Sequence, residues 1–221
     1  MRFDENWFSQ AGQDKWVDLI LKGKKNGYFL DIGAGDGWGD SNTFYFEDKL
    51  GWTGICVECG VQDYLKCKSL RKKSITTPLA IWSSETDLSF AIGSHSVHTS
   101  GFGLPVKAIT LKMLFEKYNV PTEIDYISLD IEGSEVEALK GFPWGTHKVA
   151  AWTVEHNLYL KKDPTMKNGI YDILSKNGYI RAVENIACKD SHWGAFEDWY
   201  LHEDYAHLNE SVDLSFVKKS V

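Results

Sequence analysis

The chain of 221 residues has the length of one domain, for which roughly 150 residues is usual, with room for extensions. Its 43% hydrophobic and 25% charged residues are typical of globular proteins and exclude disordered and fibrous architectures. The 24 Lys and Arg residues against 31 Asp and Glu residues give a net charge of −7, which argues against a nucleic-acid partner because such partners require a basic surface.

The first ten residues, Met1–Gln10, are charged and aromatic, so they lack the apolar stretch of a signal peptide. No apolar run reaches the roughly 20 residues that span a membrane. We therefore expect a cytoplasmic protein with no membrane partner and with reduced cysteines. Cys56 and Cys59 have C-x-x-C spacing, but no second pair completes a zinc site.

Apolar and amphipathic segments alternate along the chain after a first predicted helix, Gln13–Lys22. The predicted strands are, in chain order, Tyr28–Ile32, Gly54–Glu58, Ile75–Trp82, Asp125–Asp130, Val149–Glu155, Gly178–Glu184 and Asp198–His202. The predicted helices between them are Ser41–Leu50 (with Ser41 or Asn42 as N-cap), Tyr64–Leu70, Ser134–Lys140 and Asn168–Lys176. This alternation predicts an α/β fold, a mostly parallel sheet with helices on both faces, in one domain spanning 1–221 with an N-terminal helical extension to about residue 25.

One segment does not follow this alternation. Gly93–Pro105 is rich in glycine and serine and contains His95 and His98, so it is predicted to be a loop. A loop of this length is either a lid over a binding cleft or a solvated excursion. Both interpretations stay open at the level of sequence.

A glycine-rich turn, D-I-G-A-G-D-G at Asp31–Gly37, directly follows the first predicted strand and precedes a helix. Glycines allow a sharp turn and a close approach to a ligand, and the first amides of the following helix attract an anion. A dinucleotide-binding G-x-G-x-x-G would require a glycine at Trp38. The acid at Asp31 instead favours a cationic ligand.

S-adenosylmethionine fits this pattern, since it carries a sulfonium, an ammonium and a carboxylate. Asp31 would accept from the ammonium, and the helix start near Ser41 and Asn42 would bind the carboxylate. Glu58 ends the next predicted strand, 27 positions after Asp31, where an acid can accept from both ribose hydroxyls. The predicted cofactor-contacting residues of the turn itself are Gly33, Ala34, Gly35 and Asp36.

Five motifs together resemble the FkbM-type methyltransferases of the class I S-adenosylmethionine-dependent superfamily. The motifs are S-Q-A-G-Q-D (Ser9–Asp14), F-L-D-I-G-A-G-D-G (Phe29–Gly37), S-N-T (Ser41–Thr43), G-I-C-V-E (Gly54–Glu58) and I-D-Y-I-S-L-D-I-E-G-S-E (Ile124–Glu135). The last is the most specific. The sequence departs from the family pattern at Gly35, where Asn is frequent, and at Cys59, where Pro is frequent.

The resemblance implies a seven-stranded sheet with one antiparallel strand, and methylation of a hydroxyl on a sugar, glycan or polyketide-like small molecule. It also implies that Gln10 and Gln13 fold over the cofactor. Ala80 and Ile81, near the end of the third predicted strand, stand where an adenine wall is expected. The oligomeric state is not indicated by the sequence.

Polar residues at two further strand ends are the candidates for catalysis. Asp130 and Glu132 follow one strand, and Glu155 and His156 end another. Strand carboxyl ends meet at the ligand edge of an open α/β sheet, so we expect these groups near the methyl acceptor. Either His156 removes the acceptor proton, or Asp130, Glu155 and Asn157 hold Mg²⁺. Asp130 is also expected to contact the cofactor.

Two other functions remain as alternatives. A nicotinamide-dinucleotide oxidoreductase is disfavoured by the glycine spacing and by the lack of a Tyr-x-x-x-Lys pair. A non-catalytic cofactor-binding protein is disfavoured because Asp31, Glu58 and Asp130 are all present. Methylation of DNA bases is disfavoured because Ile-Glu-Gly follows Asp130 in place of an N/D-P-P-Y/F motif.

Overall fold

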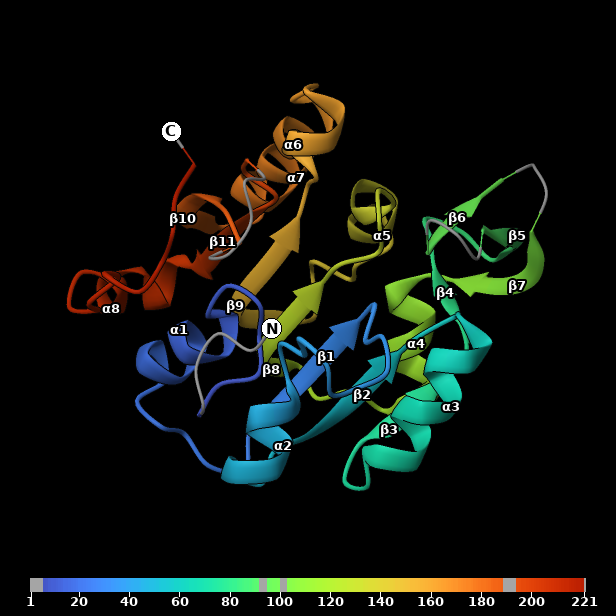
Figure 1. The fold of residues 1–221 in the computed structure, drawn as a ribbon, viewed down its shortest axis with the longest axis horizontal. Coiled ribbons are helices and arrows are strands. Elements are labelled where there is room, and N and C mark those ends of the chain that lie inside the picture. The colour runs from blue at the N-terminus through green and yellow to red at the C-terminus, as the bar shows by residue number, and fades with distance from the viewer. Residues whose placement is uncertain (1–5, 92–94, 100–102, 189–193, 221) are drawn as a thin grey trace.

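Strands and helices alternate through the computed structural model, which describes residues 6–91, 95–99, 103–188 and 194–220 (Figure 1). The seven strands of the large sheet are, in spatial order, β10 (Tyr179–Ile186), β11 (Glu197–His202), β9 (Lys148–Glu155), β8 (Glu123–Leu129), β1 (Tyr28–Ile32), β2 (Thr53–Val57) and β3 (Ile75–Thr77). β11 runs antiparallel to β9 and β10, whereas β9, β8, β1, β2 and β3 pair in parallel. The predicted α/β fold with one antiparallel strand is confirmed.

Helices cover both faces of this sheet because each presents an apolar stripe to it. One face carries α1 (Gln13–Ile20), α2 (Phe44–Leu50) and α3 (Val61–Leu70), whose buried residues include Trp16, Phe46 and Cys67. The other face carries α4 (Leu111–Tyr118), α5 (Glu135–Lys140) and α7 (Thr165–Lys176). The shorter helical segments are α6 (Leu158–Lys161), η1 (Glu203–Tyr205) and α8 (Ala206–Asn209). Among the described residues, no helix combines the length and apolarity needed to cross a membrane.

The third predicted strand, Ile75–Trp82, is wrong as a single element. The segment divides into β3 (Ile75–Thr77), in the large sheet, and β4 (Ala80–Ile81), in a second sheet. Pro78 lies between the two and has no N–H group to donate to a sheet ladder, so the strand cannot continue through it.

The second sheet has four strands in the order β4, β7 (Leu104–Ile109), β5 (Thr86–Ala91) and β6 (Ser96–His98). In Figure 1 it lies at the upper right, above α3 and α4. The prediction of a loop at Gly93–Pro105 is wrong for β6 and for the start of β7; residues 92–94 and 100–102 lie outside the described residues. Leu88, Phe90 and Val97 form a small apolar core in this sheet.

The register of the large sheet places the ends of three strands side by side. Ile32 of β1 pairs with Leu129 of β8, and Leu129 pairs with Val154 of β9. The next residues, Gly33, Asp130 and Glu155, therefore meet at the carboxyl edge. The amide of Asp130 also donates to the carbonyl of Ile32 at 2.9 Å, which continues this pairing into the site.

Candidate active site

A cavity of about 180 Å³ opens at the carboxyl edge of the large sheet. Its lining residues are Ile32, Gly33, Gly35, Val57, Glu58, Cys59, Leu79, Ala80, Ile81, His95, Val97, Asp130, Ile131 and Glu132. Seven of the site residues predicted from the sequence are among them: Gly33, Gly35, Glu58, Ala80, Ile81, Asp130 and Glu132. Residues from five separate chain segments thus meet where the topology predicts a ligand.

The glycine-rich turn is held in a shape that requires glycine at its first position. Gly33 has φ +90°, and an added Cβ would lie 1.6 Å from the carbonyl oxygen of Asp130. The amides of Gly33 and Ala34 donate to the carbonyl of Val57. Asp36 accepts from the amides of Trp38 and Gly39 at 2.9 and 2.8 Å, so its carboxylate stabilises the turn and is not among the cavity lining.

Glu58 connects the end of β2 to the turn. Its Oε2 accepts from the amide of Gly35 at 2.9 Å, and its Oε1 accepts from the amide of Gly60 at 2.6 Å. Burial raises the pKa of Glu58, and the two amide hydrogen bonds oppose that rise. A carboxylate fixed by two amides still has lone pairs for the hydroxyl groups of a ligand.

His95 and Val97 complete the cavity from the second sheet. Sequence reasoning placed both in a loop and assigned neither to the site. Cys59 and Leu79 also line the cavity without having been predicted. The only signal in the sequence was the pair of histidines in an otherwise small-residue segment, which gives no indication of which one faces the ligand edge.

Asp31 lies beneath the turn and is not among the residues that line the cavity. Its buried carboxylate accepts from the hydroxyl of Thr43 at 2.5 Å and lies 3.8 Å from Nη1 of Arg71. Burial raises the pKa of Asp31, and the charge of Arg71 opposes this. The predicted contact of Asp31 with a ligand ammonium therefore has no support from its placement.

The start of α2 also differs from the prediction. The helix begins at Phe44 with Thr43 as N-cap, because the hydroxyl of Ser41 accepts from the amide of Phe44 at 3.1 Å and stabilises a turn before the helix. Asn42 donates its side-chain amide to Ser128 at 2.9 Å. Both residues are buried, and neither is among the residues that line the cavity.

Gln10 and Gln13 lie on the side of β10 and β11, outside the cavity lining. Gln13 is buried, accepts from the amide of Ala11 at 2.9 Å and donates to Glu197 at 3.3 Å. Gln10 accepts from the thiol of Cys188 at 3.4 Å. Glu197, which pairs with Glu155 across β11 and β9, was missed by the sequence analysis because its position depends on strand register.

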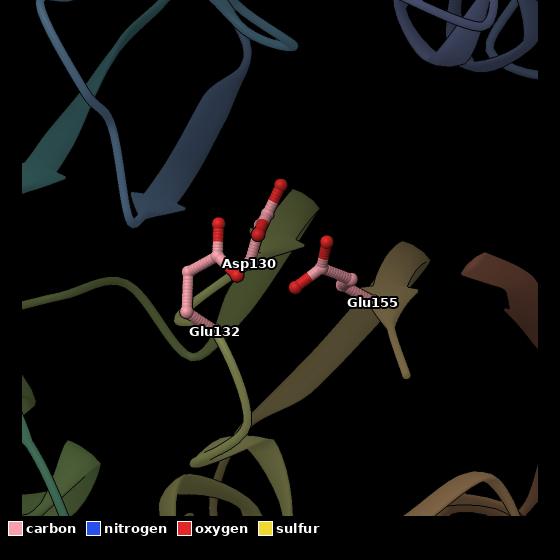
Figure 2. Close-up of side chains that lie close together, drawn as sticks. All are labelled: Asp130, Glu132 and Glu155. Atoms are coloured by element: carbon pink, nitrogen blue, oxygen red, sulfur yellow. The ribbon is translucent and has the colours of Figure 1, made fainter. Parts of the chain in front are cut away.

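Three acidic side chains converge at the ends of β8 and β9 (Figure 2). One carboxylate oxygen from each of Asp130, Glu132 and Glu155 lies within 4.8 Å of the others. Asn157 donates its amide to Glu155 at 2.6 Å and, more weakly, to Glu132 at 3.4 Å. The structure thus brings together Asp130, Glu132, Glu155 and Asn157, which were predicted at this edge.

Proximity and burial change how these acids titrate. Desolvation raises the pKa of Asp130 to about 6, with a hydrogen bond from Glu155 opposing the rise. Burial and the charge of Asp130 raise the pKa of Glu155 well above its ordinary value. Because two carboxylates this close do not both ionise readily, the pair retains a proton near neutral pH.

Glu135 supports the turn that presents Glu132. Its Oε1 accepts from the amides of Ile131 and Gly133 at 3.0 and 3.1 Å, on either side of Glu132. Glu132 has φ +58°, an unfavourable backbone conformation for a non-glycine residue that these bonds maintain. Burial raises the pKa of Glu135 to about 7.

His156 is directed away from the three acids. Its Nδ1 accepts from the amide of Leu158 at 3.2 Å, so the ring proton is on Nε2, which lies 3.4 Å from Asp198. The ring is 2% exposed. Neither nitrogen has a free lone pair for a substrate proton, so the structure does not place His156 where the predicted general base is needed.

Comparisons with known proteins agree with this geometry. A sequence model of the FkbM methyltransferase domain matches residues 31–181, about two thirds of the chain, from the glycine-rich turn to β10. No curated protein matches the chain. The solved structures that it resembles include methyltransferases of low sequence identity, which show the fold alone.

Three of these structures illustrate the likeness. An O-methyltransferase from Bacillus cereus, in complex with S-adenosylhomocysteine, is 12% identical over 86% of this chain and 80% of its own, with a TM-score of 0.53. A putative rRNA methylase from Clostridium thermocellum is 9% identical over 87% and 97%, with a TM-score of 0.51. A putative tRNA methyltransferase from Streptococcus pneumoniae, in complex with S-adenosyl-L-methionine, is 11% identical over 85% and 72%, with a TM-score of 0.50.

Proposed function

The chain belongs to the FkbM family of methyltransferases, and on this basis we propose that it transfers a methyl group from S-adenosylmethionine to a hydroxyl of a small molecule or glycan. One observation carries the proposal: the glycine-rich turn, Glu58 and the acids after β8 line the same cavity. A cofactor site and titratable groups are thereby adjacent, as methyl transfer requires.

The cavity supports S-adenosylmethionine as the cofactor in three ways. Glu58 offers a fixed carboxylate for the ribose hydroxyls. Ala80, Ile81 and Val97 offer apolar surface for the adenine ring. Gly35 lines the cavity, and an added Cβ there would meet nothing within 4 Å, so this glycine leaves room for close approach of the ligand to the backbone. We place the methionine end of the cofactor toward Asp130, beside the acids.

The chemical step is an in-line displacement. A lone pair of the acceptor oxygen forms the new O–CH₃ bond while the CH₃–S bond breaks, and its electron pair stays on sulfur as a neutral thioether. The hydroxyl proton passes to the ionised member of the Asp130–Glu155 pair. A raised pKa suits a carboxylate to this role, since it makes the group a stronger base that is still partly ionised near neutral pH.

The charge of the edge indicates the class of acceptor. Asp130, Glu132 and Glu155 gather there, and no Lys or Arg is among the described residues that line the cavity. Phosphate groups would be repelled, whereas the hydroxyls of a neutral polyol would donate to these carboxylates. This favours a sugar-like acceptor over a nucleic acid, although some structural neighbours are named as RNA methyltransferases.

A second route uses the same side chains to hold a divalent cation. The oxygen atoms of Asp130, Glu132 and Glu155 are the ligand type that Mg²⁺ prefers. The buried Oδ1 of Asn157 has no hydrogen-bond partner among the described residues, so an amide rotation would present it to an ion. A bound cation would lower the pKa of the acceptor hydroxyl in place of a carboxylate base.

Calorimetry with S-adenosylhomocysteine tests the cofactor assignment. We expect saturable binding, weakened by about 1–3 kcal/mol in Glu58→Ala because the amides of Gly35 and Gly60 and the ribose lose their acceptor. Glu137→Ala, on the outward side of α5, is the control and should bind normally. Absence of binding, or binding of a nicotinamide dinucleotide instead, would contradict the assignment.

A methyl-transfer assay on a panel of sugars, glycans and RNA then tests the acceptor class. We expect transfer to a neutral hydroxyl compound and none to RNA. Activity that survives a chelator supports the carboxylate base; activity lost with chelator and restored by Mg²⁺ supports the cation route. Transfer to RNA alone would disprove the proposed acceptor class.

A further inference from the structure

Arg71 directly follows α3, and its guanidinium lies below the glycine-rich turn with its side chain fully buried. Nε donates to Glu47 at 2.8 Å, and Nη2 donates to the hydroxyl of Thr43 at 2.9 Å. Nη1 lies 3.4 Å from the carbonyl oxygen of Gly37. The side chain of Arg71 therefore contacts both ends of the segment 37–43.

The contact with Gly37 involves packing as well as hydrogen bonding. Gly37 has φ +80°, and an added Cβ would lie 2.8 Å from the thiol of Cys67 and 3.1 Å from Cγ of Arg71. The turn thus rests directly on the arginine stem. Any change in the length or direction of that stem alters the surface on which the turn is supported.

A short hydrogen-bond relay extends the network to the end of β1. The hydroxyl of Thr43 accepts from Arg71 and donates to Asp31 at 2.5 Å. Nη1 of Arg71 is also 3.8 Å from that carboxylate. Asp31 and Glu47 compensate the buried cation, which is otherwise costly to remove from water.

Guanidinium geometry explains why arginine is required. The planar group offers five donors in fixed directions and meets Glu47, Thr43 and Gly37 at once. Lysine carries the same charge, but its single ammonium cannot span these partners. The segment that is held continues the glycine-rich turn: the amide of Gly37 donates to the carbonyl of Ala34 at 3.0 Å, and Gly33 and Gly35 on either side of Ala34 line the cavity.

We propose that Arg71 is a positioning residue for the cofactor: it holds segment 37–43 and, through Gly37, keeps the cavity-lining turn in the conformation that binds S-adenosylmethionine. This inference rests on the proposed function. It assigns a role to a residue outside the cavity, acting through Gly37, Thr43 and Asp31. Cofactor affinity should depend on the shape of the side chain at position 71 and not on its charge alone.

Arg71→Lys tests the proposal, with Arg181→Lys as the matched control. Arg181 forms an ion pair with the buried Asp198 at 3.3 Å on the opposite face of the sheet. We expect S-adenosylhomocysteine to bind Arg71→Lys at least roughly tenfold more weakly than wild type and Arg181→Lys within twofold, both below their unfolding temperatures. A general loss of stability would not weaken the measured affinity, because only folded molecules bind the ligand and the titration reports the dissociation constant of those molecules. Equal affinity of Arg71→Lys and wild type would overturn the proposal.

A milder pair keeps the test decisive if Arg71→Lys does not fold. Thr43→Val removes the hydroxyl that links Arg71 to Asp31, and Thr153→Val removes a buried hydroxyl bonded to Tyr126 at 2.7 Å. Weaker binding in Thr43→Val alone supports the proposal, and equal binding in the two variants contradicts it.

Hydrogen exchange separates this inference from the proposed function. If the wild type binds no S-adenosylhomocysteine, the proposed function fails. The positioning role is then judged by the amides of residues 38–43, which should exchange faster in Arg71→Lys than in Arg181→Lys. Equal exchange in the two variants would contradict the positioning role.

Discussion

At the residue scale, Gly33 shows how closely the two central strand ends approach. The carbonyl of Asp130 occupies the space that a side chain at position 33 would need. Gly35, two residues later, also has a left-handed backbone, with φ +54°, but an added Cβ would meet nothing within 4 Å. Gly33 therefore combines a left-handed backbone with a steric contact, whereas Gly35 has the left-handed backbone alone. Substitutions at the two positions can measure the two effects separately.

We predict that Gly33→Ala destabilises the fold by at least about 4 kcal/mol, or prevents folding, because a Cβ at 1.6 Å from Asp130 O forces the strands apart. Gly35→Ala should cost only about 1–2 kcal/mol, the price of a left-handed alanine. Urea unfolding of both variants measures the difference. Similar urea midpoints for the two variants would show that the strands accommodate a side chain at position 33 with little loss of stability.

The acid pair gives a second prediction at this scale. Asp130→Asn and Glu155→Gln should each lower turnover at saturating S-adenosylmethionine by roughly 10²–10⁴-fold, because each variant removes a member of the pair that accepts the proton. Glu137→Gln, whose carboxylate is bonded to Ser83 and Lys140, is the control. Normal turnover in both acid variants would place the proton acceptor elsewhere.

His156 provides the complementary prediction. Its ring is engaged by Asp198 and by the amide of Leu158, so His156→Gln should lower the unfolding temperature and leave turnover per folded molecule within a few-fold of wild type. The comparison of thermal unfolding with turnover separates the two effects. A loss of turnover as large as that of Asp130→Asn would restore His156 as the base.

At the element scale, the strands of the large sheet were predictable because each is a short apolar run followed by polar or glycine residues. The run Tyr28–Ile32 coincides with β1, and Val149–Glu155 differs from β9 by one residue. The second sheet was not predicted. Its strand β5 alternates buried Leu88 and Phe90 with polar residues, but this pattern lies in a segment dominated by Ser, Thr and Gly.

The residues of the candidate site also fall into those that the sequence predicted and those that it did not. Residues adjacent to strand ends, such as Glu58 and Asp130, were found because parallel topology brings strand ends together. Arg71 and Glu197 were not predicted, since their contacts depend on tertiary structure and strand register, which spacing along the chain does not reveal. The ring direction of His156 was not predictable for a related reason: the sequence places the residue at the edge, but its Nε2 lies 3.4 Å from Asp198 on another strand.

The second sheet leads to a prediction about ligand-dependent order. Strand β6 has three residues and pairs with β5 alone, and Val97 of β6 lines the cavity. Such a short edge strand opens easily, and a ligand in contact with it should hold it closed. We expect S-adenosylhomocysteine to slow hydrogen exchange at Val97 several-fold and to leave Ile180 of β10 unchanged. Equal effects at both positions, or no effect at Val97, would show that cofactor binding does not specifically stabilise the second sheet.

At the scale of the whole molecule, carboxyl groups buried around the carboxyl edge lie within a chain of net charge −7. Burial raises the pKa values of Asp130, Glu135 and Glu197 to about 6, 7 and 8. Each group binds its proton more tightly in the folded state than in the unfolded state. These three acids therefore reduce stability as they ionise, which is a cost of gathering them at one edge of the sheet.

Glu197 lies beside Glu155 in the strand register, and it allows this cost to be measured without replacing either member of the proposed catalytic pair. Its folded pKa of about 8 exceeds the ordinary value of 4.5, so its contribution to stability is present below about pH 4.5 and is lost as pH rises toward 8. We predict that the free energy of unfolding falls by a few kcal/mol between pH 5.5 and 8.5, and that Glu197→Gln removes a large part of this fall. Asp130, Glu135 and Glu155, whose pKa values are also raised, should account for the slope that remains. Glu137→Gln, at a carboxyl whose pKa is lowered by Lys140, should keep the wild-type slope. Urea unfolding at four pH values measures the effect, and parallel curves for wild type and Glu197→Gln would show that Glu197 is already ionised in the fold.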